Sequence, residues 1–119
     1  MTKVLTIDDE LIIRMSCERA LSSVGYEVKT ASGGKEGLSI LEKERFNLVL
    51  LDLKMPDVDG IEVLKLIRVK WPDTKVIIIT GYGTDQTAEE TMKHGADYLL
   101  EKPFTPDKLL SAINETLRL

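Results

Sequence analysis

Residues 49–60 read VLLDLKMPDVDG, an apolar run that ends in an acid and continues into a loop with further charges. Residues 48–51 have the uninterrupted apolar character of a strand that is buried on both faces. A carboxylate in apolar surroundings is costly unless it is paired or binds a metal. Asp52 is therefore either an exposed strand boundary or a group held at that place for chemistry.

Strand and helix patterns alternate along the whole chain on both sides of this segment. Apolar spacing predicts strands at residues 3–7, 27–31, 47–51, 75–80 and 98–100. Helical spacing predicts helices at residues 11–24, 35–44, 61–70, 84–94 and 106–117. Runs such as LVLL and VIII indicate strands covered on both sides. The expected fold class is α/β, with a single doubly wound, five-stranded parallel sheet and five helices.

The composition limits the classes of function. The chain has 119 residues, 43% of them hydrophobic, which suits one domain spanning residues 1–119. A net charge of -4 argues against nucleic-acid binding across the bulk surface. The sequence contains no apolar stretch long enough for a membrane span, and its single cysteine, Cys17, excludes an internal disulfide. We therefore expect a soluble, cytoplasmic protein with no membrane partner.

Polar side chains stand where the predicted strands end, which is the edge where open parallel sheets carry functional groups. In chain order they are Asp8, Asp9, Glu10, Asp52, Thr80, Gly81 and Lys102. Clustered carboxylates repel one another unless a cation or a lysine balances their charge. Since Mg²⁺ prefers carboxylate oxygens and leaves room for a phosphoryl oxygen, the set predicts magnesium-dependent phosphoryl transfer with an aspartate nucleophile.

Other chemistries lack the residues that they need. The only histidine, His94, stands beside Gly95 at a predicted helix end, so neither a Ser/His/Asp arrangement nor a zinc site is expected. The segment ASGGKEG, residues 31–37, matches neither spacing of a phosphate-binding loop. Asp57 and Asp59 are interpreted as turn and cap residues rather than ligands.

In this order and at these strand ends, the residues resemble the receiver domains of two-component response regulators. The resemblance rests on the pair Asp8 and Asp9, the segment LDLKMPDVDG around Asp52, Thr80 with Gly81, and EKPF at residues 101–104. It covers nearly the whole chain and implies a flavodoxin-like fold with strand order 2-1-3-4-5. The segments TGYGT and EKPF are similar to receivers of the nitrogen-regulator and nitrogen-fixation classes.

The resemblance implies a role for each acid. Asp52 would be the phosphoacceptor, taking a phosphoryl group from a sensor histidine kinase or a phosphotransfer protein. Asp9, Asp52 and the backbone carbonyl of Lys54 would bind Mg²⁺, while Asp8 would act through a metal-bound water. The domain would then catalyse its own phosphorylation and dephosphorylation rather than act as a conventional enzyme, and would switch conformation to control a downstream partner.

The resemblance also implies which residues contact the phosphoryl group. Lys102 would contact one of its oxygens, Thr80 would move toward it and report its presence, and the small Gly81 would leave the pocket open. The bond between Lys102 and Pro103 is expected to be cis, because the family's turn there aims the lysine into the pocket and proline makes that isomer accessible.

Two tyrosines, Tyr98 and Tyr82, stand near the predicted site in the sequence. The family usually carries Tyr or Phe three residues before the lysine, where this chain has Leu99. Tyr98 is one residue earlier, so it is expected on the opposite face of the strand. We further hypothesise that Tyr82, two residues after Thr80, partly shields the phosphoryl group from water.

Rival functions from other classes fit less well. A phosphatase of the haloacid dehalogenase type needs a second acid two residues after the nucleophile, where this chain has Lys54. A flavin carrier needs a hydroxyl-rich loop after the first strand, which reads IDDEL. The alternative that stays open is a degenerate receiver that acts only as a docking module. A homodimer formed on phosphorylation, and either a stand-alone receiver or one excised from a longer regulator, also stay open.

Overall fold

The computed structural model describes residues 1–81 and 85–118 and confirms the predicted α/β class. Its strands are β1 (Lys3–Ile7), β2 (Glu27–Ala31), β3 (Leu48–Asp52), β4 (Lys75–Thr80) and β5 (Tyr98–Glu101). Its helices are α1 (Leu11–Ser22), α2 (Gly34–Lys43), α3 (Gly60–Lys70), α4 (Asp85–Lys93) and α5 (Pro106–Leu117). All neighbouring strands are parallel, in the expected order β2-β1-β3-β4-β5.

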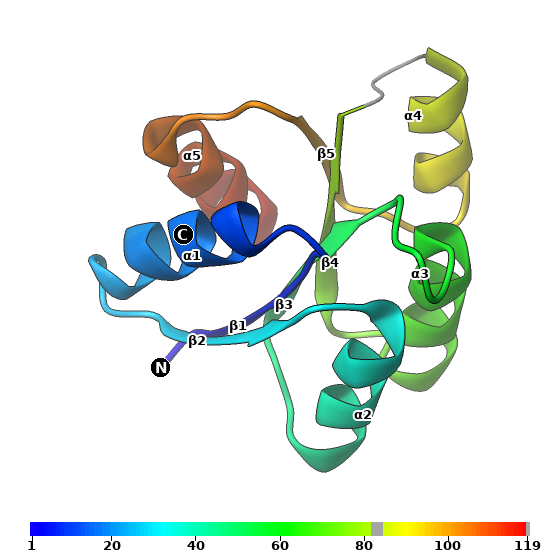
Figure 1. The fold of residues 1–119 in the computed structure, drawn as a ribbon, viewed down its shortest axis with the longest axis horizontal. Helices are drawn as coiled ribbons and strands as arrows, with labels where there is room; N and C mark the ends of the chain where they lie inside the picture. The colour runs from blue at the N-terminus through cyan, green and yellow to red at the C-terminus, as the bar shows by residue number, and fades with distance from the viewer. Residues whose placement is uncertain (82–84, 119) are drawn as a thin grey trace.

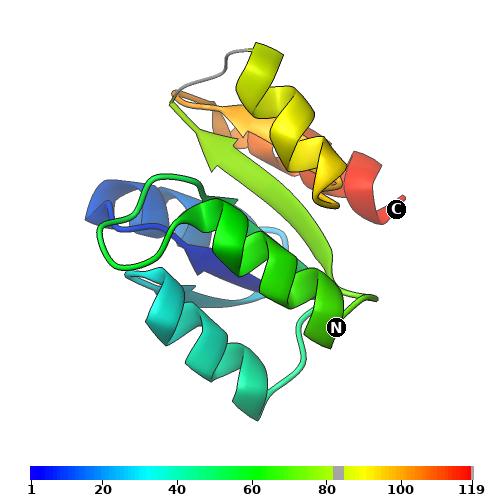
Figure 2. The same cartoon turned by 90° about the vertical axis from the view of Figure 1, so that its right-hand side faces the viewer.

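The helices cover the sheet from both sides. Helices α1 and α5 lie on one face, and α2, α3 and α4 lie on the other (Figure 1). Figure 2 shows the second face, with these three helices in front of the strands. Along β3, Val49 and Leu51 pack into the core beneath α2 and α3, whereas Leu48 and Leu50 pack into the core beneath α1 and α5. This two-sided burial explains why the strand is apolar without alternation.

Element boundaries lie within two residues of the predicted ones. Helix α1 ends at Ser22, two residues early, because the chain turns through Gly25 at a φ of 88°. Strand β3 extends to Asp52, so the acid is the last residue of the strand rather than the first of a loop. The remaining ends shift by at most one residue, and Thr84, the predicted start of a helix, lies outside the described residues. None of the helices in the described ranges combines the length and the apolar character of a membrane span.

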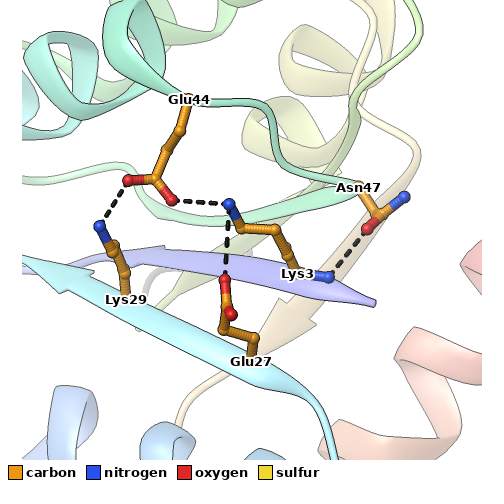
Figure 3. Close-up of polar contacts among 5 residues, drawn as sticks. All are labelled: Lys3, Glu27, Lys29, Glu44 and Asn47. Atoms are coloured by element: carbon orange, nitrogen blue, oxygen red, sulfur yellow. Dashed lines mark hydrogen bonds and ion pairs between the residues drawn. The ribbon is translucent and has the colours of Figure 1, made fainter. Parts of the chain in front are cut away.

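A polar network joins strand starts at the amino-terminal edge of the sheet (Figure 3). Lys3 Nζ lies 2.7 Å from Glu44 Oε1 and 3.4 Å from Glu27 Oε2, and Lys29 binds the other oxygen of Glu44. The Lys3 N–H donates to Asn47 Oδ1 at 2.8 Å. Hydrogen bonds from Lys29 and Lys3 hold the pKa of Glu44 below its ordinary value. Ion pairs that are partly exposed, as these are, contribute little stability, so the network mainly connects β1, β2 and the end of α2 at the edge that lies opposite Asp52.

Candidate functional site

Three carboxylates meet at the carboxyl-terminal edge of the sheet. Asp8 and Asp9 follow β1, and Asp52 ends β3, the strand that pairs with β1. One oxygen from each of the three lies within 4.8 Å of the others. Asp8 and Asp52 are buried, whereas Asp9 is exposed at the mouth of the cluster. The sheet therefore brings together the acids that the sequence predicted as a group.

Lys102 reaches this cluster from the end of β5. Its Nζ atom lies 3.0 Å from Asp8 Oδ2, 3.6 Å from Asp52 Oδ1 and 3.5 Å from Glu10 Oε1. The Lys102 N–H donates to the Thr80 carbonyl at 2.8 Å, and the following bond to Pro103 is cis, the isomer that the resemblance implies. One ammonium group thus faces three acids on two other segments of the chain.

The charges of the cluster shift one another's pKa values. Burial and the negative charge of Asp8 raise the pKa of Asp52 to about 7, and burial raises the pKa of Asp8. Burial acts to lower the pKa of Lys102, but its contacts with Asp8 and Asp52 outweigh that and raise it. Asp8 Oδ2 is within ion-pair distance of Lys102 but makes no well-directed hydrogen bond with any described residue. The site therefore carries more negative charge than Lys102 balances.

The loop after Asp52 is shaped by its own turn and cap residues. The Gly60 N–H donates to the Leu53 carbonyl at 2.9 Å, and a Cβ on Gly60 would lie 2.5 Å from Leu53 Cα. Asp59 caps α3 by accepting from the Ile61 N–H at 3.1 Å. Asp57 caps a different helix, α2. Both acids are caps, as predicted, but the partner of Asp57 was not foreseen.

The backbone of Lys54 and the side chain of Thr80 flank the acids. A hollow of about 490 Å³ lies between Asp9 and the loop of residues 53–59, which includes Lys54. Thr80 is buried at the end of β4, beside β3, and lines a cavity of about 170 Å³ together with Lys54. A Cβ on Gly81 would contact no described atom within 4 Å. Of the predicted phosphate-contacting residues, Thr80 thus ends the strand next to Asp52, Gly81 follows it directly, and Lys102 follows β5.

Leu99 and Tyr98 lie on opposite faces of β5, as predicted. Leu99 is partly buried against the core beneath α2 and α3, whereas Tyr98 packs against the core beneath α1 and α5. Tyr98 therefore does not replace the family's aromatic residue on the face of Leu99. Tyr82, the proposed shield, lies outside the described residues.

Residues 4–114 match the family described as the response regulator receiver domain. The chain belongs to this family. The receiver is 41% identical over 116 residues to the probable transcriptional regulator ycf27 of Cyanophora paradoxa, covering 98% of this chain and 48% of that protein. It is 38% identical to sporulation initiation phosphotransferase F of Bacillus subtilis (strain 168), covering 98% of this chain and 94% of that one.

The solved structures agree with these relatives. A CheY-like response regulator receiver domain protein from Methanospirillum hungatei JF-1 superposes with a TM-score of 0.95 at 37% identity, covering 99% of this chain and 94% of that one. As a receiver, the chain functions in two-component phosphorelay signalling. It spans about half the length of several curated relatives, including ycf27.

Two contacts at the receiver's site escaped sequence reasoning. Glu10 approaches Lys102 although 92 residues separate them, and Arg14 Nη1 donates to the Asp8 carbonyl at 2.9 Å. Glu10 was visible as a third acid after the first strand, but its partner was not. Arg14 carries no sequence pattern that distinguishes it from a solvated helix residue.

Proposed function

We propose that this receiver accepts a phosphoryl group on Asp52 in a magnesium-dependent reaction. The observation that carries the proposal is the buried Asp52 carboxylate, which ends a rigid strand within a cluster of acids that Lys102 only partly neutralises. Rigid placement of a nucleophile beside a cation site is what phosphoryl transfer requires.

The donor set fits a magnesium ion. All three side chains offer carboxylate oxygens, and Asp8 Oδ2 is buried without a well-directed hydrogen bond among the described residues. We propose that Asp9, Asp52 and the Lys54 carbonyl bind the ion and that Asp8 acts through a bound water. When bound, Mg²⁺ would supply positive charge against the carboxylates and the phosphoryl oxygens.

The reacting groups of the chain have distinct roles in this proposal. An Asp52 oxygen attacks phosphorus as the bond to the donor imidazole nitrogen breaks, so the phosphoryl group moves to Asp52 and neutral imidazole leaves after taking up a proton. Lys102 turns from the acids toward a phosphoryl oxygen, and the Thr80 hydroxyl donates to another. Movement of Thr80 would then change the surface that a downstream partner reads.

The proposed donor is a phosphohistidine on a sensor histidine kinase or a phosphotransfer protein. The start of α1 supports docking of such a partner, because Leu11, Ile12 and Met15 are largely exposed just after Asp9 and Glu10. We place this exchange in the cytoplasm, which the buried free thiol of Cys17 supports. A homodimer formed on phosphorylation stays a prediction.

The proposal is tested with acetyl phosphate and Mg²⁺, followed by intact-protein mass measurement. The wild type should gain one phosphoryl group, Asp52→Asn should gain none, and Asp9→Ala should require far more Mg²⁺. Asp73→Asn, which removes an exposed acid between α3 and β4, should behave as the wild type. A wild type that stays unphosphorylated would favour the docking module, and equal labelling of Asp52→Asn would exclude Asp52 as the acceptor.

A further inference from the structure

One carboxylate, Asp57, fastens the loop after Asp52 to helix α2. Asp57 Oδ1 accepts from the Gly34 N–H at 3.2 Å, and Oδ2 accepts from the Lys35 N–H at 3.0 Å. Oδ1 also accepts from the Val58 N–H at 2.8 Å within its own loop. The N-cap residue of α2 is Gly33, which has no side chain to offer. The first free N–H groups of α2 are therefore satisfied by a residue that lies more than a helix and a strand further along the chain.

The contact is close-fitting on both sides. A Cβ on Gly33 would lie 2.8 Å from Asp57 Oδ2, and a Cβ on Gly34 would lie 3.1 Å from Val58 Cβ. The Lys35 N–H and its neighbours hold the pKa of Asp57 below its ordinary value, so the carboxylate is ionised at the positive end of α2. This accounts for the paired glycines of ASGGKEG, which form no phosphate loop: they let the Asp57 loop approach the backbone.

The position of this contact matters for the proposed metal site. Lys54 stands two residues after Asp52 and three before Asp57, in the same loop. A backbone carbonyl has no side-chain torsions with which to adjust to an ion, so its placement follows the loop backbone. Gly60 fixes the far end of the loop against Leu53, and Asp57 fixes its middle against α2.

We propose that Asp57 is a positioning residue for the metal site. By accepting hydrogen bonds from the first turn of α2, it holds in place the loop that presents the Lys54 carbonyl. This inference rests on the proposed function, because that function places the ion at this carbonyl. Binding of the ion and ordering of the first turn of α2 are then coupled, and the coupling is reciprocal. Loss of the hydrogen bonds between Asp57 and α2 weakens metal binding, and the bound ion in turn protects the Gly34 and Lys35 amides from hydrogen exchange.

Two variants break the hydrogen bonds between Asp57 and α2 in different ways. Asp57→Ala removes the acceptor and one negative charge. Gly33→Ala keeps every charge and suits an extended residue at φ −168°, but its Cβ displaces the Asp57 carboxylate. Both should bind Mg²⁺ roughly tenfold more weakly in calorimetry, the lower end of what loss of an outer-shell partner costs. The double variant should lose no more Mg²⁺ affinity than either single variant, because both substitutions remove the same contact.

Two readouts, amide hydrogen exchange and Mg²⁺ affinity, separate positioning from a purely structural cap. In the wild type, Mg²⁺ should slow hydrogen exchange at the Gly34 and Lys35 amides, and in Asp57→Ala it should not. Wild-type Mg²⁺ affinity in both variants, even with lowered stability, would show that Asp57 only caps α2 and would overturn the inference. Weakening in Asp57→Ala alone would assign the effect to charge and would also overturn it. A wild type that binds no Mg²⁺ would instead remove the proposed metal site itself.

Discussion

Replacing Asp52 by asparagine should stabilise the folded protein, although it abolishes the proposed acceptor. The side chain is 6% exposed, and burial together with the charge of Asp8 raises the pKa of Asp52 from 3.8 to about 7. The folded state therefore holds this proton more tightly than the unfolded chain, and wild-type stability falls as pH rises from about 4 through about 7. At about 1.36 kcal/mol for each pH unit, the total loss of folding stability over this range is on the order of 4 kcal/mol.

Asparagine keeps the shape of the side chain without the charge. In a chelator, urea unfolding should show Asp52→Asn more stable than the wild type by on the order of 2 kcal/mol at pH 5 and on the order of 4 kcal/mol at pH 8. Magnesium at about 100 times its Kd should raise the free energy of unfolding of the wild type by about 2.7 kcal/mol and that of the variant by less. Asp73→Asn serves as the control for loss of an acid elsewhere. Equal stabilities at pH 8 would refute the view that ionised Asp52 is strained by its surroundings.

Two further substitutions test other parts of the site. Lys102→Met leaves Asp8 and Asp52 without their ammonium partner. Urea unfolding should therefore show a loss of stability of about 2 kcal/mol at pH 8 and a smaller loss at pH 5, where the acids take up protons. A loss that does not depend on pH would contradict this account. Gly60→Ala places a Cβ 2.5 Å from Leu53 Cα and 2.6 Å from the Asp52 carbonyl oxygen, so it should lower the free energy of unfolding by at least about 2 kcal/mol. Gly81→Ala, whose Cβ meets no described atom within 4 Å, should lower it little. Equal thermal stability of the two variants would show that the loop shifts to accommodate the Cβ.

Much of this protein is determined by patterns that are local in the sequence. Uninterrupted apolar runs such as residues 48–51 specify strands covered on both faces, and helical spacing between them specifies a doubly wound sheet. Because all strands of such a sheet are parallel, their carboxyl ends share one edge. Acids that directly follow the first strand and end the third strand were therefore predicted at that edge, and they come within 4.8 Å of one another there because β1 and β3 pair. The opposite facing of Tyr98 and Leu99 follows from the two-residue period of a strand.

The tertiary structure alone decided which distant groups pair. Nothing near Asp57 in the sequence shows that it caps α2 rather than α3, because a carboxylate accepts from any N–H that the fold brings near. Glu10 and Lys102 meet only because crossover connections bring the ends of β1 and β5 to one site. The pKa of Asp52 likewise depends on burial and on Asp8, which act through space rather than along the chain. Periodicity specifies elements and faces, whereas hydrogen bonds and charges are set by distances that exist only after folding.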